Sequence, residues 1–221
     1  MGQRGRPPKI ASQEQVARAM GLFWSRGYLD TRIEDLVEKA GANRFSLYAS
    51  HGGKEGLYLK ALELYREEVM PQLLQPLAGE HASLAEIHRF FAQFLTALDA
   101  PDSRLGCLIC AAAVEAAPLE PAIADRVAGY VAELDELFRT ILERARARGE
   151  LTPDAEPAML ADHLVGAVIG LMTLARSPMP RAMVKNYVRG VLRFIESLAR
   201  TPIPTPTHQL ERSISWPQST G

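Results

Sequence analysis

The hydrophobic positions of this chain recur at the spacing of helices along most of its length. The first apolar stripe consists of Val16, Ala19, Met20 and Phe23. Steps of three and four residues place such positions on one face of an amphipathic helix. This predicted helix begins after Ser12, a residue type that caps helix N-termini, and it ends at Gly27.

Two short helices and a longer one are predicted next. Thr31 and Glu34 have the spacing of a capping box, which predicts a second helix up to the turn at Gly41. A third predicted helix spans about 43–51 and ends at the glycine pair 52–53. A fourth starts near residue 54 and runs into the seventies.

The remainder of the chain is also helical in pattern. Ser83 and Glu86 form another capping box, and further helices are predicted over 105–117, 121–148, 156–176 and 180–199. No segment alternates with period two, and no internal repeat is present. The sequence therefore predicts an all-α protein of about nine helices. Residues 201–221, rich in Pro, Ser and Thr, are expected to be a disordered tail.

Composition narrows the class of protein. The 221 residues are 47% hydrophobic, which is typical of a globular chain with a substantial core. No run of eighteen apolar residues and no apolar N-terminal region is found, so we expect neither membrane insertion nor export. Two cysteines are too few for a disulfide framework. These features favour the reducing cytoplasm as the location.

Charge is distributed unevenly. The chain has a formal net charge of −1, but residues 1–60 hold ten Lys/Arg against six Asp/Glu. The first eight residues, rich in Gly, Pro and Arg, are predicted to be a flexible basic arm. A basic end on an acidic body favours a polyanion as the partner of the N-terminal region.

Residues 32–51 fit a helix-turn-helix, in which the start of the second helix reads base edges in the major groove. Arg44 and Asn43 at that start can pair with guanine and adenine, whereas the Ser46 and Tyr48 hydroxyls suit phosphate oxygens. Thr31 and Lys54 stand at helix N-termini, which favour anions. The arm supplies further cations at Arg4, Arg6 and Lys9.

Residues 9–69 resemble the N-terminal domain of the TetR/AcrR family of transcriptional regulators. The matching positions are Ala19, Phe23, Gly27-Tyr28, Thr31, Ile33, Leu36, Ala40-Gly41, Ser46-Leu47-Tyr48, Lys54-Glu55 and Leu57, preceded by the GRPPK arm at 5–9. His51 departs from the family, which usually has an aromatic residue there, and it either covers the core edge or contacts phosphate. The expected DNA-contacting set is Arg4, Arg6, Lys9, Thr31, Arg32, Asn43, Arg44, Phe45, Ser46, Tyr48, His51 and Lys54.

The resemblance implies that residues 70–200 form a helical domain for effector binding and dimerisation, with the last two long helices in the interface. Independently, residues 164–175 are apolar around the whole helix, and such a helix must be covered on every side. A central core helix of a monomer is the alternative. A symmetric dimer would place two reading helices about 34 Å apart on a palindrome-like operator in double-stranded DNA. The expected interface residues are Leu164, Ala167, Val168, Leu171, Val191 and Phe194.

An effector pocket is expected among the aromatic and sulfur-bearing helices of this domain, for a small molecule whose identity the sequence does not reveal. The candidate lining is Phe90, Phe91, Phe94, Cys107, Cys110, Tyr130 and Leu134. Aromatic residues at helical spacing are also typical of plain core. Cys107 follows Gly106 at a predicted helix start, where the dipole lowers a thiol pKa, so it is either a sensor of electrophiles or oxidants or a buried core residue.

The leading interpretation is a dimeric repressor that a small-molecule effector releases from its operator, although activation also remains open. A sensor that uses Cys107 is the alternative within the same fold. An enzyme with Cys107 as nucleophile lacks an orienting histidine, and a sequence-blind DNA binder does not need a capped reading helix. We expect no cofactor and no metal, because one C-x-x-C pair lacks further ligands nearby.

Overall fold

The structure, a computed structural model, describes residues 12–41 and 44–203. The arm residues Arg4, Arg6 and Lys9, the residue Asn43, and 204–221 of the expected tail lie outside the described residues. The described elements are α1 (Ser12–Arg26), α2 (Ile33–Lys39), α3 (Arg44–His51), α4 (Gly53–Glu68), α5 (Met70–Leu73), η1 (Gln75–Leu77), α6 (Leu84–Ala97), η2 (Pro101–Leu105), α7 (Leu108–Glu115), α8 (Pro121–Ala147), α9 (Pro157–Arg176) and α10 (Arg181–Ser197).

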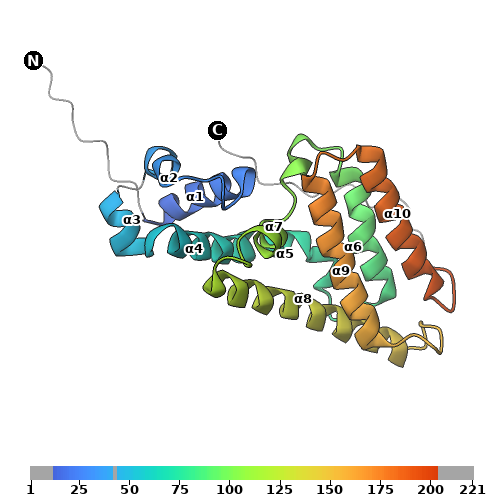
Figure 1. Ribbon diagram of the computed structural model, residues 1–221. Coiled ribbons are helices and arrows are strands. Elements are labelled where there is room, and N and C mark those ends of the chain that lie inside the picture. Colours follow the sequence, from blue (N-terminus) through green and yellow to red (C-terminus); the bar gives the residue numbers. More distant parts are fainter. Residues whose placement is uncertain (1–11, 42–43, 204–221) are drawn as a thin grey trace, which may run out of the picture.

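All the regular elements of the described residues are helices, and one isolated β-bridge pairs Leu151 with Ala199. The predicted all-α fold is confirmed. Figure 1 shows α1, α2 and α3 gathered at one end, while α6, α9 and α10 stand side by side at the other. The helix α4 runs from the first group toward the second, and α5, α7 and α8 lie along it.

An aromatic cluster joins α1 to α4. The ring centroids of Phe23 and Tyr58 are 4.7 Å apart, and those of Tyr28 and Tyr58 are 4.8 Å apart. Trp24 meets Tyr65 edge to face at 5.0 Å. Each such pair contributes about 0.5–1.5 kcal/mol beyond the burial of its area, so the first three helices are fixed firmly to α4.

The start of α2 differs from the prediction. Thr31 does not cap this helix, because its side chain is fully buried and its hydroxyl donates a hydrogen bond of 2.6 Å to the Gly27 carbonyl. The capping position is instead Arg32, whose backbone N–H donates to the Asp35 carboxylate at 3.1 Å. The box predicted at Ser83 is confirmed, because the Glu86 carboxylate accepts from the Ser83 N–H at 2.9 Å.

A glycine in α4 permits the close approach of α3. A Cβ atom at Gly56 would lie 1.8 Å from the carbonyl oxygen of His51, the last residue of α3. No side chain fits at that distance, so the contact requires glycine. The positions of α3 and α4 relative to each other therefore depend on Gly56.

The body is built around α9, which packs against α8 and α10. The helix has the length and a mean hydropathy of 1.7 that would allow a membrane span. Its Leu160, Leu164, Val168 and Leu171 side chains are all buried inside the protein. This burial explains the apolar sequence of α9 as that of a core helix.

Candidate nucleic-acid interface and ligand cavity

The outer face of α3 carries large side chains that do not take part in folding. Leu47 is fully buried against the core, whereas Phe45 is 82% exposed and Tyr48 is 59% exposed. Arg44, at the first position of the helix, is also exposed. Two exposed rings beside a cation on a short helix indicate a contact surface.

Arg44 forms an ion pair with Glu34 of α2. Both side chains are about two-thirds exposed, and such pairs contribute about 0–1 kcal/mol because water and salt screen them. A phosphate or a base edge can therefore replace Glu34 as the partner of Arg44 at little energetic cost. In the absence of DNA, this ion pair places the Arg44 guanidinium beside α2.

His51 is buried, and the predicted phosphate contact is wrong. Its ring Nε2 lies 3.3 Å from the Gln15 Oε1, and Gln15 in turn donates to the Gly41 carbonyl at 3.3 Å. Burial, and then the nearby Lys60 ammonium, lower the pKa of His51. Lys60 donates to the Ser50 carbonyl at the end of α3. These contacts connect the turn at Gly41 with the C-terminal end of α3, and the burial of His51 agrees with the packing role that was expected for it.

The other predicted contact residues divide into three groups. Arg32, like Arg44, Phe45 and Tyr48, is exposed on this surface, and its contact with DNA stays a prediction. The Ser46 side chain lies outside the described part of the chain. The Thr31 side chain is buried and does not reach this surface, and an anion at the helix N-terminus beside it stays a prediction.

Lys54 is half-buried, and its ammonium lies 4.3 Å from the centre of the Tyr28 ring. Desolvation lowers the pKa of Lys54, while the Glu115, Glu120 and Asp30 carboxylates oppose this shift. The cation therefore points toward the body of the protein. Its predicted contact with DNA is not tested by this arrangement.

A cavity of about 330 Å³ lies where α4, α5, α7 and α8 meet. Its walls are mainly apolar, with charged groups at one side, and the lining residues are Arg66, Glu67, Met70, Pro71, Leu74, Ile109, Tyr130, Glu133, Leu134 and Leu137. Of the residues predicted for the pocket, Tyr130 and Leu134 line it. A volume of this size suits a small organic molecule.

The predicted lining by Phe90, Phe91 and Phe94 is wrong. Their rings are buried and pack on one another and on Phe138, with centroids 5.1 Å apart for the first two. Cys107 and Cys110 are buried and are also absent from the cavity wall. The face of α6 that carries these rings meets α8 and α10 rather than the cavity, which the spacing along a single helix does not reveal.

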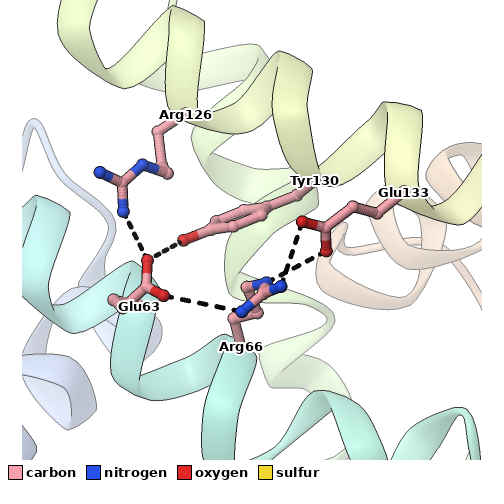
Figure 2. A network of polar contacts seen from close by, with 5 residues as sticks. All are labelled: Glu63, Arg66, Arg126, Tyr130 and Glu133. Carbon is pink, nitrogen blue, oxygen red and sulfur yellow. Dashed lines mark hydrogen bonds and ion pairs between the residues drawn. The ribbon is translucent and has the colours of Figure 1, made fainter.

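A polar network closes one side of the cavity and joins α4 to α8 (Figure 2). The Tyr130 hydroxyl donates to Glu63 at 2.7 Å, and Arg126 also donates to this carboxylate. These two donors, Tyr130 first, lower the pKa of Glu63. Arg66 forms two hydrogen bonds of 3.1 Å with Glu133. A second hollow of about 520 Å³ lies against the same network.

Comparisons with known proteins agree with this arrangement. Residues 16–61 match the model of bacterial regulatory proteins of the tetR family. Residues 83–191 match the model of the tetracyclin repressor-like C-terminal domain. This chain belongs to the TetR family of transcriptional regulators.

Individual members of the TetR family are similar over most of their length. The repressor ComR of Escherichia coli is 29% identical over 174 residues, which are 78% of this chain and 83% of ComR. The uncharacterised regulator YezE of Bacillus subtilis is 28% identical and is covered to 95%. A cysteine mutant of the TetR regulator CifR, complexed with 26 bp of operator DNA, has a TM-score of 0.72 and 28% identity, with 85% of this chain and 98% of CifR covered.

The outer helices of this TetR protein correct the predicted dimer interface. Leu164, Ala167, Val168, Leu171 and Val191 are buried within the protomer, and Phe194 packs at 4.4 Å on the His163 ring. The first five side chains form the protein's own core and are therefore not a surface for a second subunit, whereas Phe194 is half-buried. The exposed stripe of α9 and α10 instead contains His163, Gly166, Thr173, Met183 and Gly190.

Several buried contacts connect the two ends of this TetR protein. The Trp24 indole N–H donates to the Gly106 carbonyl at 3.1 Å, and Arg176 donates to the Trp24 and Leu105 carbonyls at 2.6 and 3.0 Å. Nearby, the Leu29 N–H donates to Glu115 at 2.9 Å. The helix α1 is therefore bound to α9 and to Gly106 after η2, and the loop that follows α1 is bound to α7.

The two cysteines of this TetR protein stand at the start of α7, where Cys107 is the capping residue and Cys110 is in the first turn. The Cys110 thiol, followed by the N–H groups of this turn and the Tyr65 hydroxyl, lowers the pKa of Cys107 against the effect of burial. The same contact and burial raise the pKa of Cys110. The first cysteine is thus the more readily ionised of the pair.

Proposed function

We propose that the protein binds operator DNA through the N-terminal end of α3 and represses transcription, and that it acts as a homodimer released by a small-molecule effector. The exposed Arg44, Phe45 and Tyr48 on a helix held by buried Leu47 carry this proposal. Arg at a recognition helix suits guanine in the major groove, and the Tyr48 hydroxyl suits phosphate. The similarity to the ComR repressor and to CifR bound to operator DNA supports it.

The dimer would form through the exposed stripe of α9 and α10. Glycines at 166 and 190 leave space on that stripe, because a Cβ atom there would meet no neighbouring atom of the protomer within 4 Å. Small residues let two helices approach closely, and the exposed Met183 adds apolar area. A twofold pairing would present two α3 helices to a palindrome-like site with half-sites about 34 Å apart. We place the boundary between the DNA-binding and dimerisation domains at residues 69–70.

The effector would occupy the 330 Å³ cavity. Its walls come from α4 and α8, and α4 leads directly to the joint with α3. A molecule with an apolar body and one polar group fits Leu134, Leu137 and the Tyr130 hydroxyl. Release requires that the effector binds better to a dimer whose α3 helices no longer match the operator.

Covalent change at the thiols is a second candidate for the inducing signal. Cys107 has a lowered pKa and lies one residue from the Gly106 contact with α1, and the crystallised form of the regulator CifR is a cysteine mutant. We do not propose an enzyme, since His88 pairs with Glu196 and His163 packs on Phe194 rather than activating a thiol. The cytoplasm suits free thiols and a DNA partner.

The test begins with selection of bound fragments from genomic DNA, followed by titration of one selected operator and one random duplex at several salt concentrations. Arg44→Ala is expected to lose about 1–3 kcal/mol of binding free energy on the operator and much less on random DNA. The matched control is Arg89→Ala, another exposed arginine paired with a carboxylate, Glu86, but on α6. No preference for any duplex by the folded protein, or equal losses for both variants, would refute the proposal.

A further inference from the structure

We propose that Cys107 and Cys110 form a reversible intramolecular disulfide when a peroxide oxidises the protein, and that this bond weakens operator binding. The inference rests on the DNA-binding function proposed above, and it assigns separate roles to the two sulfur atoms. Cys107 is the attacking thiolate, and Cys110 is the resolving thiol.

The position of the pair at a helix start favours this chemistry. Cys107 precedes α7 with extended backbone angles, φ −103° and ψ 130°, and Cys110 stands three residues later in the first turn. A C-x-x-C pair at a helix N-terminus places both thiols on one side of the chain, where the N–H groups of the turn stabilise a thiolate. In a reducing compartment, such dithiols serve redox functions rather than structural ones.

A third group supports the site from α4. The Tyr65 side chain is fully buried near Cys107, and its hydroxyl has no hydrogen-bond partner among the described residues. A phenol next to a thiol can donate to the thiolate when the thiol loses its proton. The buried Tyr65 hydroxyl can therefore stabilise the thiolate form of Cys107 in the reduced protein.

The reaction balances without a cofactor. The Cys107 thiolate attacks one peroxide oxygen, the O–O bond breaks, and the departing oxygen takes the electron pair and a proton to leave as water or an alcohol. Cys107 is then a sulfenic acid. The Cys110 sulfur attacks this sulfur, the S–S bond forms, and hydroxide leaves with the Cys110 proton as water. Two thiols lose two electrons in total, and the peroxide gains them.

Access suits a small oxidant. Cys107 is 5% exposed and Cys110 is 8% exposed, so each presents a small area to solvent. Hydrogen peroxide is close to water in size and can reach such atoms, whereas a bulky reagent is excluded. The small exposed area of the two cysteines therefore favours reaction with a peroxide over reaction with a larger electrophile.

Bond formation would move the chain next to α1. The Cβ atoms of residues three apart on a helix are about 5–6 Å apart, and a disulfide needs about 3.8 Å, so Cys107 must move roughly 1–2 Å toward α7. Gly106 precedes it with a φ of 62°. The Gly106 carbonyl is bound to the Trp24 indole, and a Cβ at this residue would lie 2.8 Å from the Met172 carbonyl. A segment fixed between α1 and α9 transmits such a shift.

Tyr65 offers a second route to the DNA-contacting end. Its ring meets Trp24 edge to face, with centroids 5.0 Å apart, and its hydroxyl loses the Cys107 thiolate when that sulfur enters the disulfide. Contacts on both α1 and α4 therefore change together. The reading helix α3 is held by these two helices, so its presentation to DNA changes with them.

The experiment uses the full-length, reduced protein, hydrogen peroxide as the oxidant, and an operator obtained by selection. Trypsin leaves both cysteines in the single peptide 105–126, because no Lys or Arg lies between Arg104 and Arg126. The expected disulfide is seen as the loss of two hydrogens from this peptide, reversed by dithiothreitol. In parallel, operator affinity is expected to fall by about 5- to 150-fold, the usual range of allosteric coupling, and to recover on reduction.

Three variants assign the roles. In Cys110→Ser, a sulfenic acid on Cys107 should accumulate and be trapped by dimedone once the peroxide is removed and the protein is unfolded, whereas Cys107→Ser should give no such adduct. The matched control is the double variant Cys110→Ala/Ala113→Cys, which keeps two thiols but moves the second three residues, about 4.5 Å, further along α7 and away from Cys107, and it should form no intramolecular disulfide. Circular dichroism shows whether each variant is folded, and the wild-type peptide measurement decides the question without them.

Three outcomes separate the possible failures. Unmodified wild-type cysteines, at peroxide levels that oxidise a folded thiol standard, would overturn the inference and leave the proposed function intact. A disulfide that forms without any change in operator affinity would overturn the regulatory role. A reduced protein that selects no operator would instead refute the DNA-binding function, independently of the thiols.

Discussion

Gly56→Ala tests how α3 is positioned. The new Cβ would lie 1.8 Å from the His51 carbonyl oxygen, and ordinary contacts of this kind begin near 3.4 Å, so α3 and α4 must separate by roughly 1.5 Å. Crowding of a well-packed site costs about 1–3 kcal/mol, whereas alanine gains at most about 1 kcal/mol in helix propensity. We expect a net loss of about 1 kcal/mol in stability, which lowers Tm by roughly 2–4 °C.

Operator binding should fall further than stability. A displacement of this size takes the Arg44 end of α3 out of hydrogen-bonding distance from a base edge, and each good bidentate pair contributes about 1–3 kcal/mol. With two subunits, we expect at least about a hundredfold weaker binding at a temperature where the variant is folded. Titration of the selected operator by fluorescence anisotropy, beside a thermal melt, measures both quantities.

Gly21→Ala is the matched control. It makes the same change inside α1, where the new Cβ meets nothing within 4 Å, so we expect a slightly raised Tm and unchanged operator affinity. If Gly56→Ala behaves like Gly21→Ala in both measurements, the close approach of α3 and α4 does not control DNA binding.

Three further predictions follow from the buried polar groups and the cavity. Because burial lowers the pKa of His51 in the folded state, the unfolded chain takes up the proton first as pH falls. The free energy of unfolding therefore decreases as the pH falls from the ordinary histidine pKa of about 6.5 to the lowered pKa of His51 in the folded protein. His51→Gln should reduce this loss in urea unfolding at about pH 7.5 and 5.5, and an unchanged pH dependence would contradict it. Tyr130→Phe removes the hydrogen bond to Glu63 and should lower the free energy of unfolding by about 0.5–1.5 kcal/mol. Tyr187→Phe loses a longer contact of 3.4 Å and should stay within about 0.5 kcal/mol of the wild type; equal losses would count against the network. Leu137→Trp fills the cavity, so compounds that release the wild type in a screen should lose at least about tenfold in potency, with operator affinity unchanged in their absence. Undiminished potency would place the effector elsewhere.

The helices were predictable because their signals are local. Ser83 with Glu86, the glycines at 27, 41 and 149, and the apolar stripes each act within one turn of chain, and the observed ends of α8, α9 and α10 lie within two residues of those predicted. The start of α2 was misplaced because the Thr31 hydroxyl could either accept from an N–H of the first helical turn or donate back to the Gly27 carbonyl. Only the packing of that turn selects between them.

The site was less predictable because its geometry is non-local. The rings of Phe90, Phe91 and Phe94 resemble a ligand wall in sequence, but α8 and α10 cover them. The wall of the observed cavity instead includes Arg66 of α4 and Met70 of α5, two helices whose sequences showed no sign of a pocket. Likewise, the apolar residues on all sides of α9 predicted that this helix is buried. They did not reveal which of its faces is buried within the protomer.

His51 illustrates the same limit in a single residue. Its sequence position allowed either a phosphate contact or a core role. The choice was made by Gln15, which lies 36 positions earlier and accepts or donates at both His51 and Gly41. No spacing rule connects residues that far apart.

The geometry of α4 has one more consequence. Its 14 residues from Gly53 to Arg66 span roughly 20 Å and connect the glycine joint beneath α3 with the charged side of the cavity, so a tilt at one end of this helix displaces the other. A tilt of about 5° at the Arg66 end moves the other end by roughly 1.7 Å, which is enough to lose a hydrogen bond. Effectors of quite different shape could therefore have the same effect on transcription, because each needs only to tilt α4 at its Arg66 end.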